Sequence, residues 1–544
     1  MIISAYRINS VSKPLVETDF FQSADFIFVD FLPPRRYTDG DIVKNCTESD
    51  DLERTIKMAY SSLGEFIERL DRAGELRRIK TPVSPVLEIT EIADRVMKMP
   101  GGGPALLFEN VKGSKVPLAI NLMGSRRRMS WALGADDLED IAAEIAALTR
   151  LPSDVPPTLM GKLQLLPQLA SLGKISPKLV SSSFAPCQEV VKIGAEANLD
   201  DLPILTCWPE DGGPYITLPL VFTKDEGTGK RNVGMYRIQK QGPHETGMHW
   251  QRHKVGSRHF ANFESKGRDI PVAIVLGGDP AVIYSATAPL PDDIDEMVFA
   301  GFLRKKPVEL VKCKTIDMEV PADAEFVIEG VVPAGLRRRE GPFGDHTGYY
   351  SLADDYPVLK VTAITHRRNA IYPCTIVGPP PMEDRYIGLA TERLFLPLAR
   401  LFVPEMIDYH LPAEGAFHNL ALVRIKKRYP GHAFKVMHAL WGLGQMMFTK
   451  CIVVVDEDVD VQNPGEVVWR ALANIDPERD ITFVKGPIDV LDHASPLPAF
   501  GSKMGVDATR KWPDEGFTRE WPDVLKMPAE IKAKVDTLWK DLGL

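Results

Sequence analysis

The stretch Glu340-Gly-Pro-Phe-Gly-Asp-His-Thr-Gly-Tyr-Tyr350 places two carboxylates, one imidazole and two phenols on a backbone interrupted by three glycines and one proline. Glycine and proline together disfavour a regular helix or a central strand, so this segment is predicted to be a loop fixed by turn chemistry. Loops on a rigid scaffold often carry function. Glu340, Asp345 and His346 are therefore candidate functional residues, and a solvated acidic turn is the competing interpretation.

Two further segments extend this pattern. Asn232-Val-Gly-Met-Tyr-Arg237 lies upstream of the loop, and Gly501-Ser-Lys-Met-Gly-Val-Asp-Ala-Thr-Arg-Lys-Trp512 lies downstream. With the 340–350 loop they resemble the UbiD-type decarboxylases, which remove or add a carboxyl group on an aromatic or α,β-unsaturated acid with prenylated flavin mononucleotide (FMN). The downstream segment is similar to the UbiD branch itself, the ubiquinone-pathway carboxy-lyases. The resemblance runs from about Tyr60 to the C-terminus.

The resemblance implies three domains that combine α/β and β structure. An N-terminal α/β domain is expected over residues 58–180, and a split β-barrel that binds prenylated FMN over 181–380. A C-terminal UbiD-type α/β domain that supports oligomerisation is expected over 381–544. Residues 1–57 lie outside the resemblance, show no clear periodicity and are predicted to be a partly disordered extension.

Hydrophobic periodicity favours α/β structure at both ends of this region. Ser62 followed by Glu65 forms a capping-box pattern that begins an apolar helical repeat, and Gly74 is predicted to end this helix, since glycine favours helix ends. Strands that alternate with helices are typical of α/β domains. The other predictions are helices over 86–98, 137–148 and 528–542, and strands over 105–108, 420–426 and 451–456. The last of these helices, over 528–542, is predicted to pack on a neighbouring subunit or on its own core.

The middle of the chain has a different pattern. From about residue 187 to 378, short apolar segments are separated by glycine and proline, and helical periodicity is sparse apart from residues 296–304. Such spacing predicts an all-β barrel core. The strands of this core are predicted over 215–223, 233–240, 271–277, 357–366 and 370–377.

Composition limits the class of protein. A chain of 544 residues should divide into two or three domains, and its net charge of -9 provides no overall basic field for nucleic acid. Six cysteines without a Cys-x-x-Cys pair favour neither a zinc site nor a disulfide framework. No apolar run approaches the length of a membrane helix. We expect a cytoplasmic protein that contacts the inner membrane peripherally if its substrate carries a lipid tail.

Asn232, His253 and Glu296 are the candidate metal ligands. They offer an amide oxygen, an imidazole nitrogen and a carboxylate, a mixture that suits manganese or magnesium better than a structural zinc. Ordinary hydrogen-bonding roles are the competing interpretation, but the three positions also match the ligand pattern of UbiD-type enzymes. The resemblance implies that Mn²⁺ (or Mg²⁺) joins the protein to the flavin phosphate, with K⁺ as an optional further ion.

The resemblance also implies a set of cofactor contacts. Near His253 the chain departs from the usual pattern, because it has His249-Trp250-Gln251 and Lys254-Val255 where Arg-Trp-Leu and Arg-Gly are usual. The phosphate contacts at these positions are therefore open. The cofactor-binding residues implied in this way are Asn232, Met235, Tyr236, Arg237, His249, Trp250, Gln251, His253, Lys254, Glu296 and Lys450.

The chemistry explains why a cofactor is needed. Loss of carbon dioxide from an aromatic ring leaves charge in an sp² orbital orthogonal to the π system, and ordinary side chains offer no electron sink for it. The resemblance implies a covalent adduct between the substrate and prenylated FMN. Asp345 would return a proton to the ring carbon, while Glu340 and Arg237 form a charge pair and Arg237 offers a fork to the substrate carboxylate. Related cinnamic-type decarboxylases carry Glu at the second acidic position, so Asp345 favours a phenolic acid.

Three classes of function compete. The leading hypothesis is decarboxylation of 4-hydroxy-3-polyprenylbenzoate in ubiquinone biosynthesis; a menaquinone-pathway naphthoate or a free hydroxybenzoate would share the same motifs. An FMN-dependent oxidoreductase would need a hydride-donor site, and no Gly-x-Gly-x-x-Gly follows a strand. A non-catalytic cofactor-binding or assembly protein would leave Glu340, Asp345 and Arg237 unused. Expected partners are the aromatic acid, a flavin prenyltransferase that supplies the cofactor, and further copies of the chain in a hexamer or a dimer.

Overall fold

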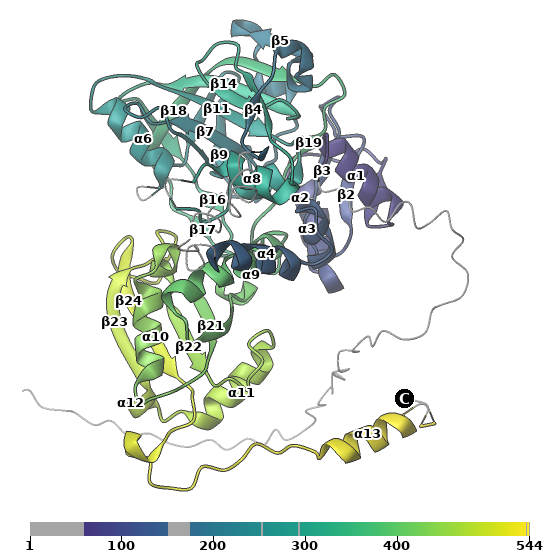
Figure 1. Ribbon diagram of the computed structural model, residues 1–544. Coiled ribbons are helices and arrows are strands. Elements are labelled where there is room, and N and C mark those ends of the chain that lie inside the picture. Colours follow the sequence, from purple (N-terminus) through teal and green to yellow (C-terminus); the bar gives the residue numbers. More distant parts are fainter. Residues whose placement is uncertain (1–58, 151–173, 252–253, 292–293, 540, 543–544) are drawn as a thin grey trace, which may run out of the picture. The chain divides into compact units, whose positions relative to one another are not determined.

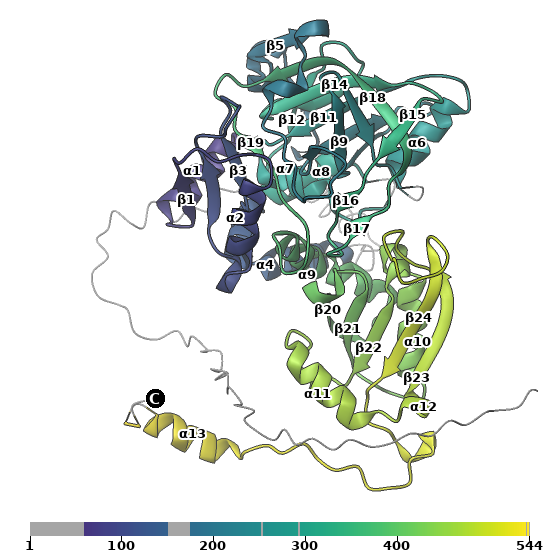
Figure 2. The same cartoon turned by 180° about the vertical axis from the view of Figure 1, so that it is seen from behind.

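The computed structural model describes residues 59–150, 174–251, 254–291, 294–539 and 541–542, and all of them belong to the unit formed by residues 56–544. The predicted N-terminal extension lies outside these residues. Figure 1 and Figure 2 show three groups of elements that follow one another along the chain: mixed helices and strands, a central group rich in strands, and a second mixed group. The architecture is therefore mixed α/β with three domains.

The N-terminal domain begins with helix α1 (Leu63–Arg72), as its capping signal predicts. The Ser62 hydroxyl accepts a hydrogen bond from the Glu65 N–H at 3.1 Å, and the Glu65 carboxylate accepts one from the Ser61 N–H at 2.7 Å. These bonds satisfy two backbone donors that a helix start otherwise leaves unpaired. The other elements of this domain are β1 (Leu76–Ile79), α2 (Glu88–Met97), β2 (Ala105–Phe108), β3 (Leu118–Ile120), α3 (Arg126–Ala132) and α4 (Leu138–Arg150).

The N-terminal sheet contains a strand from a distant part of the chain. Its order is β1-β2-β3-β19, and β19 (Tyr372–Pro373) pairs parallel with β3. The predicted barrel strand over 370–377 is therefore wrong, because only two of its residues form a strand and they extend the N-terminal sheet. A short buried apolar segment fits any sheet with an open edge, so tertiary packing decides which sheet it joins.

The central domain is built on a ten-stranded sheet in which β11 (Ile270–Leu276), β14 (Phe326–Val332) and β18 (Asp354–His366) lie side by side (Figures 1 and 2). The other strands of this sheet are β5 (Val190–Ile193), β6 (Tyr215–Ile216), β7 (Leu220–Lys224), β8 (Arg231–Gly234), β9 (Ile238–Gly242), β10 (Glu245–Met248) and β15 (Arg337–Glu340). Its main path is β6-β9-β10-β18-β14-β11-β7-β8, with β5 and β15 paired to β18. Among the described strands the two ends of this path, β6 and β8, do not pair, so the sheet does not close as a barrel.

The central domain also differs locally from the prediction. The predicted strand over 233–240 is two strands, β8 and β9, and Met235, Tyr236 and Arg237 form the break between them. Helix α8 (Glu296–Arg304) confirms the predicted helix. Helices α6 (Val255–Glu264) and α7 (Pro280–Ser285) are absent from the prediction, because short helices draw most of their stability from tertiary packing. The smaller strands of this domain are β4 (Lys178–Leu179), β12 (Glu309–Lys312), β13 (Glu319–Pro321), β16 (Phe343–Gly344) and β17 (Tyr350–Ser351).

The C-terminal domain has a five-stranded sheet with parallel strands at its centre. The predicted strands over 420–426 and 451–456 are confirmed as β21 (Leu420–Ile425) and β22 (Cys451–Val455), which pair in parallel. The other elements are β20 (Met406–His410), β23 (Ile481–Pro487), β24 (Phe500–Asp507), α9 (Asp384–Phe402), α10 (His432–Trp441), α11 (Pro464–Asn474), α12 (Pro477–Asp480) and α13 (Ala529–Leu538). The sheet order is β20-β21-β22-β24-β23. Of the helices described in the chain, none is both long and apolar enough to cross a membrane.

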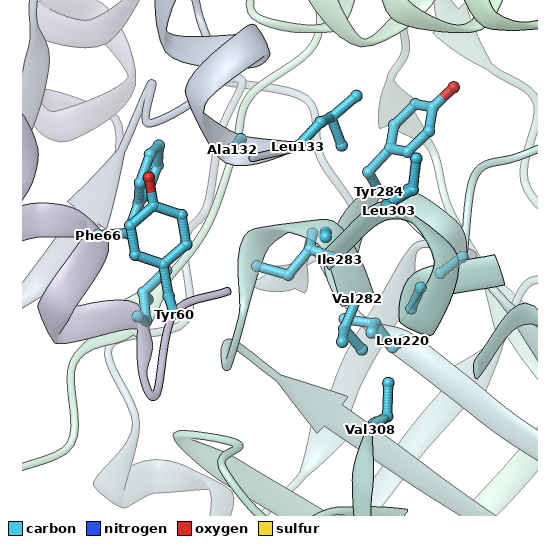
Figure 3. Packing of buried hydrophobic residues seen from close by; sticks show 14 of the residues in the cluster. Tyr60, Phe66, Ala132, Leu133, Leu220, Val282, Ile283, Tyr284, Leu303 and Val308 are labelled. Carbon is cyan, nitrogen blue, oxygen red and sulfur yellow. The ribbon is translucent and has the colours of Figure 1, made fainter. Parts of the chain in front are cut away.

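A buried apolar cluster joins the N-terminal and central domains (Figure 3). Tyr60 and Phe66 pack edge to face with their ring centroids 5.1 Å apart. Ile283 and Tyr284 of α7 and Leu303 of α8 belong to the same cluster. Burial of a large apolar side chain contributes about 1.5–3 kcal/mol, so this cluster stabilises the contact between the two domains.

Candidate active site

Arg237 lies in the loop between β8 and β9 and is paired with both predicted acids. Its Nε and Nη2 donate to Glu340 Oε1 and Oε2 at 3.0 and 3.1 Å, and its Nη1 donates to Asp345 Oδ2. Nη2 also donates to Ser351 Oγ at 2.9 Å. Because four of the five guanidinium N–H groups are used, one N–H on Nη1 remains for a substrate. In this structure the guanidinium fork binds Glu340, and the predicted contact of Arg237 with a substrate carboxylate stays a prediction.

The two acids are buried and held ionised. Burial favours the neutral form of a carboxyl group, but at Glu340 the hydrogen bond from His249 and the charge of Arg237 outweigh burial and lower the pKa to about 2. At Asp345 burial also raises the pKa, but the hydrogen bond and charge of His346, together with the charge of Arg237, outweigh burial and hold the pKa well below its ordinary value. The cluster is a paired network of buried charges.

His249 completes the Glu340 end of this network. Its Nδ1 lies 3.0 Å from Glu340 Oε2, and its ring packs on the ring of Tyr356 with centroids 4.4 Å apart. The other ring nitrogen, Nε2, is buried and has no hydrogen-bond partner among the described residues. Because buried polar atoms are nearly always hydrogen-bonded, an orphaned nitrogen marks a place where a bound group would make contact. His249 therefore fits a cofactor-contacting position.

The 340–350 segment is more regular than predicted. Glu340 is the last residue of β15, and β16 and β17 pair as a hairpin whose turn carries Asp345. The Asp345 N–H donates to Tyr349 O at 3.1 Å, and the Asp345 carbonyl accepts from the Gly348 N–H at 2.9 Å. These bonds close the turn, so the direction of the Asp345 side chain is fixed by backbone hydrogen bonds.

A cavity of about 210 Å³ is lined in part by the turn that follows Asp345. His346, the neighbour of Asp345, lines it together with Lys450 and Asn419 from the C-terminal domain. Lys450 Nζ lies 2.5 Å from Asp492 Oδ2, which lines the same cavity. The structure thus places Lys450 at a cavity lined by residues of both the central and the C-terminal domains, together with His346.

A second cavity, of about 500 Å³, brings together two of the three predicted metal ligands. Asn232 on β8 and Glu296 at the start of α8 both line it. The Asn232 Nδ2 is buried without a hydrogen-bond partner among the described residues. Burial raises the pKa of Glu296 to about 7, although the Val233 N–H donates to its Oε2 at 3.1 Å. A desolvated carboxylate of this kind would be stabilised by a cation.

The predicted ligand His253 lies outside the described residues. Among those residues, no group of three or more His, Cys, Asp and Glu side chains could hold a metal. Asn232 and Glu296 nevertheless supply two oxygen ligands at one cavity, which is the donor chemistry that Mn²⁺ or Mg²⁺ prefers. The residues that are described therefore fit the implied divalent ion.

The other implied cofactor contacts surround the same region of the chain. Met235 and Tyr236 lie in the loop after β8, and both pack against buried apolar clusters. Trp250 is buried, and its indole Nε1 has no hydrogen-bond partner among the described residues. Gln251 and Lys254 flank the undescribed residues, and burial lowers the pKa of the Lys254 ammonium. An unpaired donor and a desolvated cation fit a ligand that carries phosphate.

Three residues of the site come from the structure alone. Ser351 accepts a hydrogen bond from Arg237, and the His418 Nε2 lies 2.9 Å from the His346 Nε2. Asp384 is the first residue of α9, and burial raises its pKa to about 7 while the charge of His346 acts against that shift. No local pattern marks these residues, because each is a single polar residue whose contact is with a distant segment.

Family models cover most of the described chain. The models described as the N-terminal, Rift-related and C-terminal domains of 3-octaprenyl-4-hydroxybenzoate carboxy-lyase match residues 67–148, 178–380 and 385–508. An uncharacterized protein of Aquifex aeolicus (strain VF5) is 53% identical over 486 residues, which cover 89% of this chain and 99% of that protein.

Solved structures of similar length have the same fold. The UbiD-class enzyme HmfF from Pelotomaculum thermopropionicum, in complex with FMN, is 32% identical with a TM-score of 0.73, and the match covers 88% of this chain and 99% of that chain. An evolved dimeric form of HmfF was solved with prenylated FMN; it is 31% identical with a TM-score of 0.71 over 87% of this chain and 98% of that chain. The vanillic acid decarboxylase of Sedimentibacter hydroxybenzoicus, in a closed form, is 28% identical with a TM-score of 0.76 over 89% of this chain and 99% of that chain.

The matches extend through all three domains, and the paired acids, the buried arginine and the orphaned polar atoms at the second cavity lie within the matched regions. On this basis the protein belongs to the UbiD family of carboxy-lyases.

Proposed function

We propose that the protein removes the carboxylate of 4-hydroxy-3-polyprenylbenzoate, using prenylated FMN. The observation that carries the decarboxylation is the buried Arg237 with Glu340 and Asp345 on its two sides. A lipid-tailed substrate is supported by exposed apolar side chains at the β16–β17 hairpin, which carries Asp345. Tyr349 and Leu352 are 60% and 90% exposed, and they offer apolar surface where a tail would leave the site.

Asn232 and Glu296, with His253, would hold a divalent metal ion, Mn²⁺ or Mg²⁺, together with the flavin phosphate. His249 and Trp250 would contact the cofactor through ring nitrogens that have no partner among the described residues. When bound, prenylated FMN supplies the electron sink that loss of carbon dioxide requires.

The side chains of this chain would perform the remaining tasks. The free N–H on Arg237 Nη1 orients the substrate carboxylate. Asp345, once protonated, returns a proton to the ring carbon that has lost carbon dioxide. Glu340 takes no proton in this scheme and holds Arg237 in position through the bidentate pair.

A second candidate substrate is a hydroxybenzoate without a tail. It is supported by the likeness to vanillic acid decarboxylase and by the charged side chains at the first cavity, among them Lys450 and Asp492. The two candidates share the same residues and differ in what occupies the space beyond the ring.

The test is turnover of enzyme loaded by co-expression with a flavin prenyltransferase. The assay measures carbon dioxide release from a prenylated 4-hydroxybenzoate, vanillate and 4-hydroxybenzoate, with cinnamate as the acid that should react least. Asp345→Asn keeps the size of the side chain but cannot protonate carbon, so turnover should fall by about 10²–10⁴-fold, or roughly 3 to 5 kcal/mol of barrier, while flavin stays bound.

The control variant is Asp355→Asn, which alters an exposed acid on β18 of the same domain and should leave turnover unchanged. Release from vanillate but not from the prenylated acid would select the second candidate. Native turnover in Asp345→Asn, or no release from any of these acids by fully loaded enzyme, would refute the proposal.

A further inference from the structure

Two histidines from different domains meet beside Asp345. The His346 Nε2 lies 2.9 Å from the His418 Nε2, and the ring centroids are 5.2 Å apart at an angle of 70°. His346 belongs to the turn of the β16–β17 hairpin in the central domain. His418 precedes β21 in the C-terminal domain. The contact therefore connects the acid-bearing hairpin with the C-terminal domain.

His346 uses both ring nitrogens. Its Nδ1 lies 2.8 Å from Asp345 Oδ1, and its Nε2 faces His418. The remaining nitrogen of the pair, His418 Nδ1, is buried and has no hydrogen-bond partner among the described residues. His346 also lines the 210 Å³ cavity. A continuous path thus runs from the cavity through His346 to the carboxylate.

The surroundings shift the pKa values of the two histidines in opposite directions. Burial lowers the pKa of His346, but the hydrogen bond and charge of Asp345, with the charges of Asp384 and Asp489, outweigh it and raise the pKa. Burial and the charge of His346 lower the pKa of His418 to about 4. These directions favour the charged form of His346, which donates from both ring nitrogens, and the neutral form of His418, whose Nε2 accepts.

Asp345 itself is ionised, because His346 and Arg237 stabilise its carboxylate. An ionised carboxylate has no proton to give to a carbon. Arg237 and the His346 backbone N–H also donate to this carboxylate, but the His346 ring is the neighbour that can release a proton, and its Nδ1 lies 2.8 Å from Asp345 Oδ1. The groups that face this pair from the surrounding elements are Arg237, His418, Asp384 and Asp489.

We propose that His346 is the proton store for Asp345, and that His418 is a positioning residue that keeps this store charged by accepting its second ring N–H. This inference rests on the proposed decarboxylation. In each turnover the proton on His346 Nδ1 passes to Asp345 Oδ1, and the Asp345 proton then passes to the ring carbon, which keeps the electron pair of the broken carbon–carboxylate bond. Water in the cavity reprotonates His346, so the net change is one solvent proton in place of carbon dioxide.

The first test is the pKa of His346 in the cofactor-free protein, measured by NMR of the histidine ring nitrogens, with His346→Asn used to identify its signal. In the native chain this pKa should exceed the ordinary value of about 6.5. His418→Leu removes the acceptor and should lower the pKa by on the order of one unit. His418→Gln keeps an acceptor oxygen and should leave the pKa near its native value.

The second test is the pH dependence of decarboxylation by cofactor-loaded enzyme. His346 is charged below its pKa, so turnover should fall as pH rises through that value. In His418→Leu the fall should move to lower pH by the shift that NMR reports, whereas His418→Gln should keep the native profile. His438→Gln changes an exposed histidine of α10 whose Nδ1 meets the Phe434 carbonyl and whose ring packs edge to face on Trp441 of the same helix, and it serves as the control.

An unchanged His346 pKa in folded His418→Leu would overturn the inference, as would an equal loss of turnover at every pH. Circular dichroism checks that each variant is folded. Failure of the proposed function looks different: no acid is decarboxylated, while the NMR shift in His418→Leu still supports the coupling of the two histidines.

Discussion

Arg237 lies between two acids that have different hydrogen-bond partners. Glu340 binds two guanidinium N–H groups and the His249 ring, whereas Asp345 binds Arg237 with one oxygen and His346 with the other. Because the pKa of Glu340 is lowered to about 2, its contribution to stability is present above the ordinary carboxyl value of about 4.3 and is lost as pH falls toward 2. In the proposed scheme Glu340 therefore holds Arg237 in place, and Asp345 receives its proton from the adjacent His346.

The Glu296 carboxylate should be needed for the binding of both the metal and the flavin. Glu296→Gln keeps the size of the side chain and its hydrogen bond from Val233, but it removes the charge that a cation would neutralise. Metal by elemental analysis and flavin by absorbance should fall together, with at least the roughly 10–100-fold loss of metal affinity that changes around a metal site produce. Glu309→Gln, at an exposed position of β12, should change neither. Full metal and flavin in Glu296→Gln would show that the ion binds elsewhere.

At the scale of the element, the β16–β17 hairpin is held by Trp208 and Asp211. The Gly344 N–H donates to Asp211 Oδ1 at 2.8 Å, and the Trp208 N–H donates to Asp211 Oδ2 at 2.9 Å. The indole Nε1 donates to Val377 O at 2.9 Å, so Trp208 is held through both its backbone and its ring. A Cβ on Gly344 would lie 2.1 Å from Trp208 Cδ1. Glycine is needed here for the close approach of the indole to the backbone.

Gly344→Ala should therefore disturb both stability and catalysis. The added methyl forces the hairpin or the indole to move, at a cost of about 1–3 kcal/mol in the free energy of unfolding. Because Asp345 follows directly, a displacement of about 1 Å should lower turnover roughly 100-fold. Denaturant unfolding and turnover measure the two effects. Gly242→Ala on β9, where a Cβ meets nothing within 4 Å, is the matched control, and native behaviour of Gly344→Ala would contradict the role of this contact.

At the scale of the whole molecule, the site depends on more than one domain. Asp345 and His346 come from the central domain, and His418 and Lys450 come from the C-terminal domain. The His346–His418 contact depends on how the central and C-terminal domains pack, whereas the Arg237–Asp345 pair lies within the central domain.

The surface of the C-terminal domain leads to a prediction about assembly. Trp469 and Leu472 on α11 are 56% and 72% exposed, which is unusual for such large apolar side chains. We expect a homo-oligomer, a hexamer first and a dimer second. Light scattering at micromolar concentration should give a mass that is a multiple of 60.4 kDa. Leu472→Glu places a charge in this apolar patch and should shift the mass toward the monomer without loss of flavin; a monomeric native protein would refute the prediction.

The sequence by itself determined the family and the helix at residues 296–304, and it named as candidates the two acids and the arginine that the structure brings together. These features depend on local information. Each of these signals can be recognised within about ten residues, whether it is a capping residue, a glycine-interrupted loop or an apolar period of 3.6 residues. The motifs that carry the resemblance are equally local. For this reason Glu340, Asp345 and Arg237 could be named before their contacts were known.

Only the tertiary structure decided which groups these residues meet. Arg237 forms its bidentate pair with Glu340, and the segment around Tyr372 joins the N-terminal sheet. His418 contacts His346 from another domain. None of these contacts leaves a periodic trace in the sequence, because each joins single residues far apart in the chain. Burial strengthens these contacts because it removes competing water. A buried polar group or charge without a partner costs free energy, so the fold depends on each of these pairings.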